Sequence, residues 1–236
     1  MRTIPLPGRR AATARPRHLR RAAGGAILAL AIILQWPLGG ARAEAIRVLA
    51  FGDSLTHGYG LKAGETFPEQ LEAALAGEGL SVTVINAGNS GDTTAAGRAR
   101  LDWALADKPD AVLLELGAND SLRGLDPSMT YENLDWILTR LGKARLPVLL
   151  AGMLAPRSLG DDYADEFDAV FPRLAAKHDV LLYPFFLEGV AAEPSLNQDD
   201  GIHPNPAGVA LIVKSIKPYV LELIGRAGGG GGQGDG

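Results

Sequence analysis

Short apolar runs alternate along the chain with longer stretches in which apolar residues recur at helical spacing. Buried β-strands are expected at IRVLAF (46–51), VTVIN (82–86), AVLLEL (111–116), PVLLAG (147–152) and DVLLYP (179–184). Amphipathic helices are expected at FPEQLEAALAGEG, TTAAGRARLDWAL, TYENLDWILTRLGKA, ADEFDAVFPRLAAKH and PAGVALIVKSIKPYVLELI. This alternation predicts an α/β fold in which helices cover both faces of a parallel sheet. Trp103 and Trp136 fall at helical spacing and are expected in the core.

Polar residues suited to chemistry gather directly after these runs. The segments GDS (52–54), NAGNSGDT (86–93) and GAND (117–120) follow the first three expected strands, and DGIHPN (200–205) precedes the last helix. In an open parallel sheet, ligands bind in the crevice outside the carboxyl ends of the strands. We therefore expect these segments, distant in sequence, to converge on one edge of the sheet.

Composition and charge narrow the class of protein. The chain has 236 residues, 47% of them hydrophobic, which suits one or two globular domains. Residues 1–43 contain eight arginines and no acidic residue, so the remainder carries 15 basic against 27 acidic side chains. Such an acidic domain argues against binding nucleic acid or an anionic membrane surface through charge. The absence of cysteine excludes disulfides, thiolate nucleophiles and cysteine-ligated metals.

The N-terminal segment has the pattern of a secretory signal peptide. Arginines between Arg2 and Arg21 precede the apolar run AILALAIIL, and a small-x-small site ends at Ala43, where cleavage is expected. A membrane anchor is the alternative, but the uncharged stretch 22–41 is diluted by glycine, glutamine and proline. The pair Arg20-Arg21 leaves open whether export follows the general or the twin-arginine route. Export would place the protein in the periplasm or outside the cell, without stable membrane insertion after cleavage.

Both ends of the chain are therefore set apart from the fold. The expected signal peptide covers residues 1–43. The tail RAGGGGGQGDG (226–236) is too rich in glycine to bury apolar surface and is expected to be disordered. Residues 44–225 are expected to form a single domain, and nothing in them indicates an oligomeric state.

Ser54, in the stretch FGDSLTHGYG (51–60), is the first candidate for chemistry. A serine hydroxyl becomes an effective nucleophile only beside a base and an oxyanion hole. The surrounding sequence is not the G-x-S-x-G turn of the α/β-hydrolases. Taken alone, the stretch fits the N-cap of a helix better than it fits a nucleophile.

His203 is the best-placed base among the four histidines. Asp200 precedes it by three residues, a spacing at which the carboxylate can accept from Nδ1–H and leave Nε2 free to face a serine. An Asx turn at Asp200 with a surface histidine is the alternative, and Asp199 is a less well placed partner for the ring. The other histidines lack an acid at that offset or are explained without catalysis: His18, His57 and His178.

An oxyanion hole requires two or three rigid N–H donors. Gly88, after the second expected strand, can bring its backbone N–H close to a substrate because it has no Cβ. Asn119, after the third, can offer its side-chain amide. A turn glycine and a helix cap explain these two residues equally well. Other polar residues are expected to brace the loops through bonds to the backbone: Asp53, Asp92, Thr93 and Asp120.

Together these segments resemble the SGNH (GDSL) hydrolase family. Its blocks occur in order: GDSL at 52–55, a glycine in NAGNSG at Gly88, G-x-N-D at 117–120 and D-x-x-H at 200–203. Each block is weak singly, but all of them in order span nearly the whole expected domain. The resemblance implies a flavodoxin-like three-layer α/β/α sandwich around a central five-stranded parallel sheet.

The resemblance also implies an activity and a role for each site residue. Ser54 would be the nucleophile, His203 the base and Asp200 its orienter. The oxyanion hole would consist of the N–H groups of Ser54 and Gly88 and the side chain of Asn119. The implied reaction is hydrolysis of a small-molecule carboxylic ester or acyl thioester through an acyl-enzyme, with no metal or organic cofactor.

Longer stretches resemble one branch of that family, the periplasmic bacterial acyl-CoA thioesterases, lysophospholipases and arylesterases; they are GDSLTHGYGL, NAGNSGDTTAAG and MLAPRSLGDDYADEFDAVFPRLA. In that branch the segment matching residues 153–163 is a mobile loop over the acyl site. His57 replaces a residue that is more often small there, and near the pocket mouth it could change acyl-chain preference or pH response. A carbohydrate acetylesterase and a non-catalytic exported acyl-binding or lipid-binding module are the alternatives.

Overall fold

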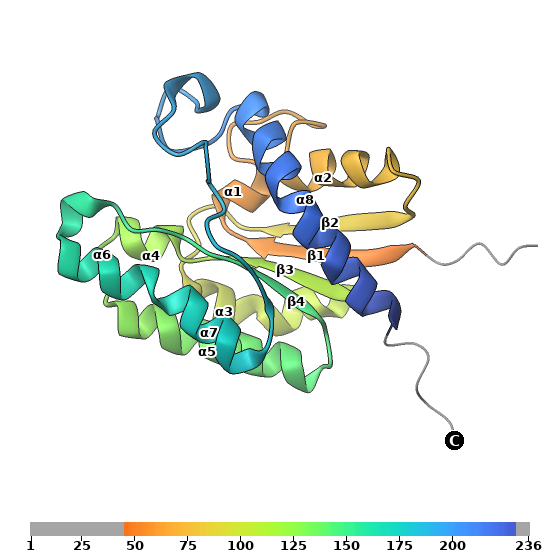
Figure 1. The fold of residues 1–236 in the computed structure, drawn as a ribbon, viewed down its shortest axis with the longest axis horizontal. Helices are drawn as coiled ribbons and strands as arrows, with labels where there is room; N and C mark the ends of the chain where they lie inside the picture. Colours follow the sequence, from red (N-terminus) through yellow and green to blue (C-terminus); the bar gives the residue numbers. More distant parts are fainter. Residues whose placement is uncertain (1–44, 230–236) are drawn as a thin grey trace, which may run out of the picture. The chain divides into compact units, whose positions relative to one another are not determined.

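The computed structural model describes residues 45–229, and its centre is a five-stranded, all-parallel sheet (Figure 1). The strands are β1 (Ile46–Gly52), β2 (Val82–Gly88), β3 (Ala111–Glu115), β4 (Val148–Ala151) and β5 (Leu181–Tyr183), in the order β2-β1-β3-β4-β5. Each lies within two residues of the boundaries predicted from the apolar runs. The expected signal peptide lies outside the described residues.

Apolar residues bury the central strands on both faces. Every residue of β3 is buried, as are the last five residues of β1. β2, at the edge of the sheet, mostly alternates between buried and more exposed side chains, as a strand with one solvated face does. The predicted parallel sheet is confirmed, and its apolar runs are continuous where the strands are central.

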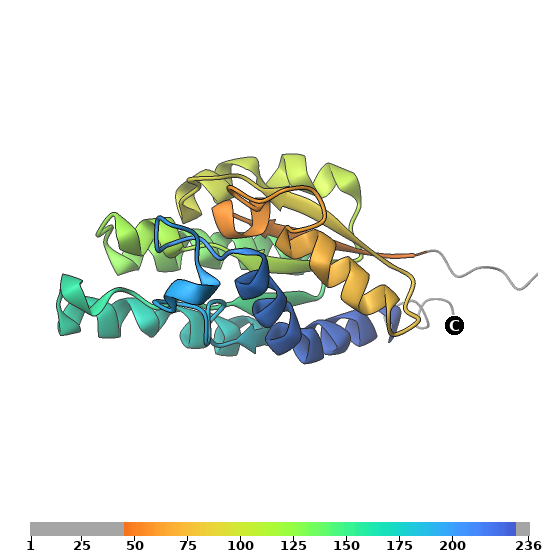
Figure 2. The same ribbon diagram turned by 90° about the horizontal axis from the view of Figure 1, so that it is seen from above.

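Helices cover both faces of this sheet (Figures 1 and 2). On one face α2 (Phe67–Ala76) packs against α8 (Pro206–Gly229), and on the other α3 (Thr94–Ala104), α5 (Pro127–Lys143) and α7 (Val170–His178) are neighbours. Shorter elements follow the strands: α1 (Ser54–His57), α4 (Ala118–Leu122), α6 (Asp161–Asp168) and the 3₁₀ turns η1 (Leu105–Asp107), η2 (Arg157–Leu159) and η3 (Pro194–Leu196). This is the predicted flavodoxin-like three-layer sandwich.

Side-chain caps define where several of these helices begin. Thr66 and Glu69 form a capping box at the start of α2. Thr93 Oγ1 accepts from the N–H of Ala96 at 3.4 Å at the start of α3, and Asp126 Oδ1 caps α5. Such caps satisfy backbone donors that have no intrahelical acceptor, so the loops at the carboxyl edge of the sheet end at fixed points.

Two helices differ from the prediction. The helix expected over ADEFDAVFPRLAAKH is split into α6 and α7, which meet at Ala169. Pro172 explains the break, because its ring would clash with the carbonyl of Asp168 four residues earlier in a continuous helix. The last helix, α8, runs to Gly229, so the first four residues of the glycine-rich tail are helical. In the described range no helix, α8 included, has a stretch apolar and long enough to cross a membrane.

The prediction that both tryptophans lie in the core is wrong. Trp103 is 77% exposed and Trp136 is 36% exposed. α3 buries Leu101 and Ala104 instead of Trp103. The guanidinium of Arg98 lies over the exposed Trp136, with its Cζ 5.0 Å from the ring centroid. Helical spacing groups residues into faces, but it does not say which face packs on the sheet.

Candidate active site

Ser54 occupies the first position of α1, directly beyond the carboxyl end of β1. Asp53, and not Ser54, caps this helix, because Asp53 Oδ1 accepts from the N–H of Leu55 at 3.0 Å. The N-cap interpretation of Ser54 is therefore wrong, and its hydroxyl is free for another contact. Because residues in the first turn of a helix have no intrahelical acceptor for their N–H, the Ser54 N–H also faces outward from the helix end.

Ser54, His203 and Asp200 form one hydrogen-bonded chain. His203 Nε2 lies 2.9 Å from Ser54 Oγ, and His203 Nδ1 lies 2.7 Å from Asp200 Oδ2. The first contact joins residues 149 positions apart in sequence. A hydroxyl, an imidazole and a carboxylate in this order can activate the hydroxyl and accept its proton.

The Asp200 carboxylate is held through both oxygens. Oδ1 accepts from the backbone N–H groups of Ile202 at 2.9 Å and of His203 at 3.0 Å, while Oδ2 faces the imidazole. The Asx turn and the histidine partner are thus one arrangement and not alternatives. The bonds from the N–H and the ring of His203, followed by that from Ile202, lower the pKa of Asp200 to about 2, so the carboxylate is ionised at neutral pH.

The serine and the imidazole open into a cleft of about 510 Å³. Its walls are mainly apolar and include Leu122, Met153, Leu154, Phe185, Leu187 and Ile202. Residues 153–156, at the start of the loop after β4, form part of the wall, where the family resemblance expects an acyl-site loop. A concave apolar site with a few convergent polar groups is suited to an acyl chain.

His57 does not line this cleft. Its side chain is exposed on α1, and its main-chain carbonyl accepts from Asn86 Nδ2 at 3.2 Å. The structure therefore gives no support to a place for His57 at the pocket mouth. Tyr59, two residues later, packs against the imidazole of His203, with ring centroids 4.6 Å apart. His178 is occupied elsewhere, where its Nε2 lies 2.6 Å from Asp135 on α5.

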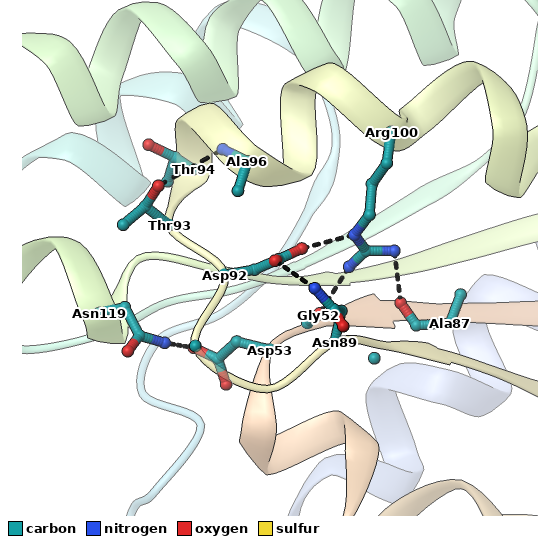
Figure 3. A network of polar contacts seen from close by, with 12 residues as sticks. Gly52, Asp53, Ala87, Asn89, Asp92, Thr93, Thr94, Ala96, Arg100 and Asn119 are labelled. Atoms are coloured by element: carbon teal, nitrogen blue, oxygen red, sulfur yellow. Dashed lines mark hydrogen bonds and ion pairs between the residues drawn. The ribbon is translucent and has the colours of Figure 1, made fainter.

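Asn119, on α4, lines the cleft together with Ser54 and His203. One N–H of its amide donates to Asp53 Oδ2 at 3.0 Å (Figure 3). An asparagine amide carries two N–H donors, so this bond fixes the plane of the amide and leaves the second donor for another acceptor. An amide held in this way can serve as an oxyanion donor.

Asp53 and Glu115 form a buried pair of carboxyl groups beneath α1. Glu115 Oε2, at the end of β3, accepts from the N–H of Asp53 at 3.3 Å and from Thr56 Oγ1 at 2.7 Å. Burial raises the pKa of Asp53 to about 6 and raises that of Glu115 well above its usual value. A Cβ at Gly52 would collide with Glu115 Oε2 and Thr56 Oγ1, so the glycine lets this carboxyl reach the segment that carries Ser54.

The geometry does not fit the oxyanion role predicted for Gly88. The Gly88 N–H donates to Asn86 Oδ1 at 3.0 Å, while the N–H of Asn89 donates to the carbonyl of Gly52 in β1. Successive N–H groups of a strand point to opposite sides, so the Gly88 N–H points away from the strand that leads to Ser54. A side chain at position 88 would collide with the backbone of His57. The glycine permits close packing of β2 on α1.

The turn that follows Gly88 offers free donors. Within this described segment, neither Ser90 nor Gly91 donates its N–H to a protein acceptor. The turn is closed by a bond from Asp92 N–H to the carbonyl of Asn89, and Arg123, at the end of α4, donates to the carbonyl of Gly91 at 2.9 Å. These contacts attach the turn to the element that carries Asn119.

Three of the residues expected to brace the loops do bond to the backbone: Asp53 to Leu55, Thr93 to Ala96 and Asp120 to Thr94. Asp92 differs, since its carboxylate pairs with the guanidinium of Arg100 on α3 (Figure 3). Sequence reasoning missed Arg100. Its signal was present, because Gly97, Leu101 and Ala104 are buried at helical spacing and place residue 100 on the same face of the helix.

Several known proteins resemble this chain over most of its length. The sequence matches the GDSL-like Lipase/Acylhydrolase family over residues 50–211. It is 37% identical over 198 residues to an arylesterase from Vibrio mimicus, covering 84% of this chain and 95% of that protein. It is 39% identical over 185 residues to thioesterase 1/protease 1/lysophospholipase L1 from Escherichia coli, covering 78% of this chain and 84% of that protein. The crystal structure of AlinE4, an SGNH-hydrolase family esterase, has 48% identity and a TM-score of 0.65, covering 76% of this chain and 96% of that one.

Proposed function

The chain belongs to the GDSL-like lipase/acylhydrolase family, and from that premise we propose that it is a serine hydrolase that cleaves carboxylic esters and acyl thioesters through an acyl-enzyme. The observation that carries the proposal is the bonded chain of Ser54, His203 and Asp200 at the mouth of an apolar cleft. A non-catalytic binding module has no need of a serine held at 2.9 Å from an oriented imidazole.

The reaction takes place in two halves. His203 Nε2 accepts the Ser54 proton as Oγ attacks the acyl carbonyl, and the imidazolium then protonates the departing alkoxide or thiolate. Water attacks the acyl-serine in the second half, with His203 again accepting the proton; the acyl–Oγ bond then breaks, and His203 returns the proton to Ser54 Oγ as the carboxylic acid leaves. Asp200, ionised throughout, holds Nδ1–H and stabilises the imidazolium. Each proton in these steps is carried by the chain's own residues.

The oxyanion formed in each half requires N–H donors that are already in place. Ser54 supplies its backbone N–H, and Asn119 supplies the amide N–H that is not bound to Asp53. Gly88 is replaced in this scheme by Gly91, whose N–H has no protein acceptor in the described turn. Gly91 has a φ of +85°, a conformation that favours glycine and that brings a bare N–H to the surface of a turn.

The cleft favours an acyl chain over a sugar. Its wall is mainly aliphatic, whereas a site for acetylated carbohydrate is expected to present a row of exposed aromatic side chains. Fatty acyl esters and thioesters match such a lining through burial of their methylene groups, each worth about 0.8 kcal/mol.

A substrate screen tests the proposed function. p-Nitrophenyl esters from acetyl to palmitoyl would be assayed beside the matching acyl-CoAs and an acetylated xylan, with the Ser54→Ala variant as background. We expect turnover of esters and thioesters, with kcat/KM rising as the chain grows until it fills the cleft. Turnover of acetylated xylan alone would favour the acetylesterase, and no turnover of any substrate would contradict a hydrolase.

Asn119→Ala tests the oxyanion donor. We expect kcat to fall about 10²- to 10³-fold with little change in KM, because the missing N–H would act mainly on the transition state. Asn133→Ala is the matched control, since that asparagine donates to Thr94 Oγ1 and does not line the cleft; steady-state kinetics on one ester compare the two. An Asn119→Ala enzyme with full kcat would remove Asn119 from the oxyanion hole.

We also propose export of the protein by cleavage after Ala43, on the basic, apolar and small-x-small pattern of residues 1–43. The arylesterase and the thioesterase described above are bacterial proteins, and in a bacterium such export would deliver the protein to the periplasm or to the medium. N-terminal sequencing of the exported protein should begin at Glu44, and recovery of the intact N-terminus would contradict cleavage.

A further inference from the structure

We infer that Arg100 is a positioning residue for hydrolysis, one that fixes the main-chain segments on either side of the nucleophile without touching the substrate. The inference rests on the proposed function, because positioning is measured through turnover. It concerns a side chain outside the GDSL, NAGNSG, G-x-N-D and D-x-x-H blocks, on the sheet-facing side of α3.

The guanidinium of Arg100 joins the ends of two strands (Figure 3). Nη2 donates to the carbonyl of Gly52, the last residue of β1, at 2.7 Å, and Nη1 donates to the carbonyl of Ala87, near the end of β2, at 2.8 Å. Nε makes an ion pair with Asp92. One planar, charged group thus bonds to three separate segments, which a point charge cannot do with the same geometry.

The Gly52 carbonyl belongs to the peptide group directly before the nucleophile segment. Arg100 and the N–H of Asn89 donate to its oxygen, and the N–H at the other end of the same peptide, on Asp53, donates to Glu115 Oε2. Rotation of this peptide would displace Ser54, which directly follows Asp53 in the chain. Such a rotation must break bonds at both ends of the peptide, so Arg100 and Glu115 hold its orientation from opposite sides.

Arg100 also stiffens the turn after β2. Asp92 accepts from Arg100 through Oδ2 and from Asn89 Nδ2 through Oδ1, so its carboxylate ties the two ends of the turn together. This is the turn that contains Gly91. The same side chain therefore acts on the segment that carries the nucleophile and on the segment that we assign to the oxyanion hole.

The surroundings of the guanidinium make these bonds strong. Arg100 is only 20% exposed, and its Cζ lies 4.1 Å from the centroid of the Phe51 ring. Charge-assisted hydrogen bonds gain strength where water is excluded, and the planar group stacks on an aromatic face. Arg98, on the same helix, makes a contrast: it donates to Asn133 and lies over Trp136 on the exposed side of α3.

Arg100→Lys and Arg100→Ala test the inference, with Arg98→Ala as the matched control. Lysine retains a charge for Asp92 but lacks the planar fork that reaches two carbonyls and a carboxylate from separate nitrogens. We expect kcat of Arg100→Lys to fall about 10- to 100-fold, because displacement of reacting groups by about 1 Å can cost 10²-fold. KM should change less than about threefold, since Arg100 does not line the cleft. Arg98→Ala should keep wild-type kcat and KM.

Rescue separates positioning from general stability. Millimolar guanidinium or methylguanidinium should restore part of the kcat of Arg100→Ala and leave Arg98→Ala and wild type unchanged, with circular dichroism to verify the fold. If Arg100→Ala does not fold, the kcat and KM of Arg100→Lys alone test whether Arg100 is a positioning residue. A folded Arg100→Lys with wild-type kcat, or a loss confined to KM, would overturn the inference. An inactive wild type would contradict the proposed function instead.

Discussion

Ser54→Ala is expected to lower kcat for any ester or thioester by about 10⁴- to 10⁶-fold. The change removes the proposed nucleophile and leaves His203, Asp200 and the cleft intact. Ser54 Oγ contacts His203 Nε2 at 2.9 Å, and its loss takes no cap from α1 because Asp53 serves that role. The variant should therefore fold as the wild type does. A p-nitrophenyl ester assay, with the melting temperature measured in parallel, checks both statements.

Ser121→Ala is the matched control for the nucleophile. Ser121 lines the same cleft, but its hydroxyl donates to the carbonyl of Ala118 at 3.0 Å and has no histidine beside it. We expect its kcat to stay within about tenfold of wild type, a range that small packing changes near a site produce. Equal losses in the two variants would mean that the cleft responds to any lost hydroxyl, and wild-type turnover by Ser54→Ala would exclude the serine mechanism.

The fold could be predicted from the apolar pattern, because buried strands occur in the sequence as short uninterrupted apolar runs. The run AVLLEL has no polar interruption before Glu115, and such a run is typical of a parallel strand buried between two layers of helices. The breaks in the pattern were harder to foresee. The split between α6 and α7 depends on Pro172, a single residue inside an otherwise helical stretch, and the outward face of Trp103 depends on which side of α3 meets the sheet.

The parts of the site differ in how local their signals are. Asp200 and His203 share one turn, so their contact could be predicted from spacing, and Ser54 was then the hydroxyl that such a pair was expected to activate. The oxyanion role predicted for Gly88 depends on a feature that is not local in sequence. The direction of its N–H is set by the register of β2 against β1, which pairs Gly52 with Gly88, and no residue near position 88 reports that register.

Ionisable residues that lie behind the ends of the strands were also hidden from sequence reasoning. The role inferred for Arg100 depends on two carbonyls from different strands, and that of Glu115 on a glycine that lets it approach α1. Every residue has a main-chain carbonyl, so the sequence does not show which carbonyls an arginine can reach. What the sequence did record was an arginine and a glutamate at positions whose neighbours are buried, a combination that is costly unless both are bonded.

Asp200→Asn is expected to lower kcat by about 10⁴-fold while the fold and KM stay close to wild type. The asparagine oxygen can keep the bonds from Ile202 and His203 N–H, so the turn survives. Its NH₂ group then faces the imidazole where Oδ2 stood. A donor at that place forces Nδ1 to accept, which puts the ring proton on Nε2, and a protonated Nε2 cannot take the Ser54 proton.

Asp199→Asn separates this effect from a general loss of negative charge. Asp199 is the adjacent carboxylate, and it is exposed. The main-chain N–H and the imidazole of His203 bond to Asp200 instead. Its substitution should leave kcat within about threefold of wild type, as surface changes usually do. Because the pKa of Asp200 is about 2, wild type should keep this carboxylate ionised across the assay range, and the deficit of Asp200→Asn should persist at every pH from 5 to 9. A deficit that vanished at high pH, or one shared by Asp199→Asn, would mean that Asp200 acts through its charge on the cleft and not through the tautomer of His203.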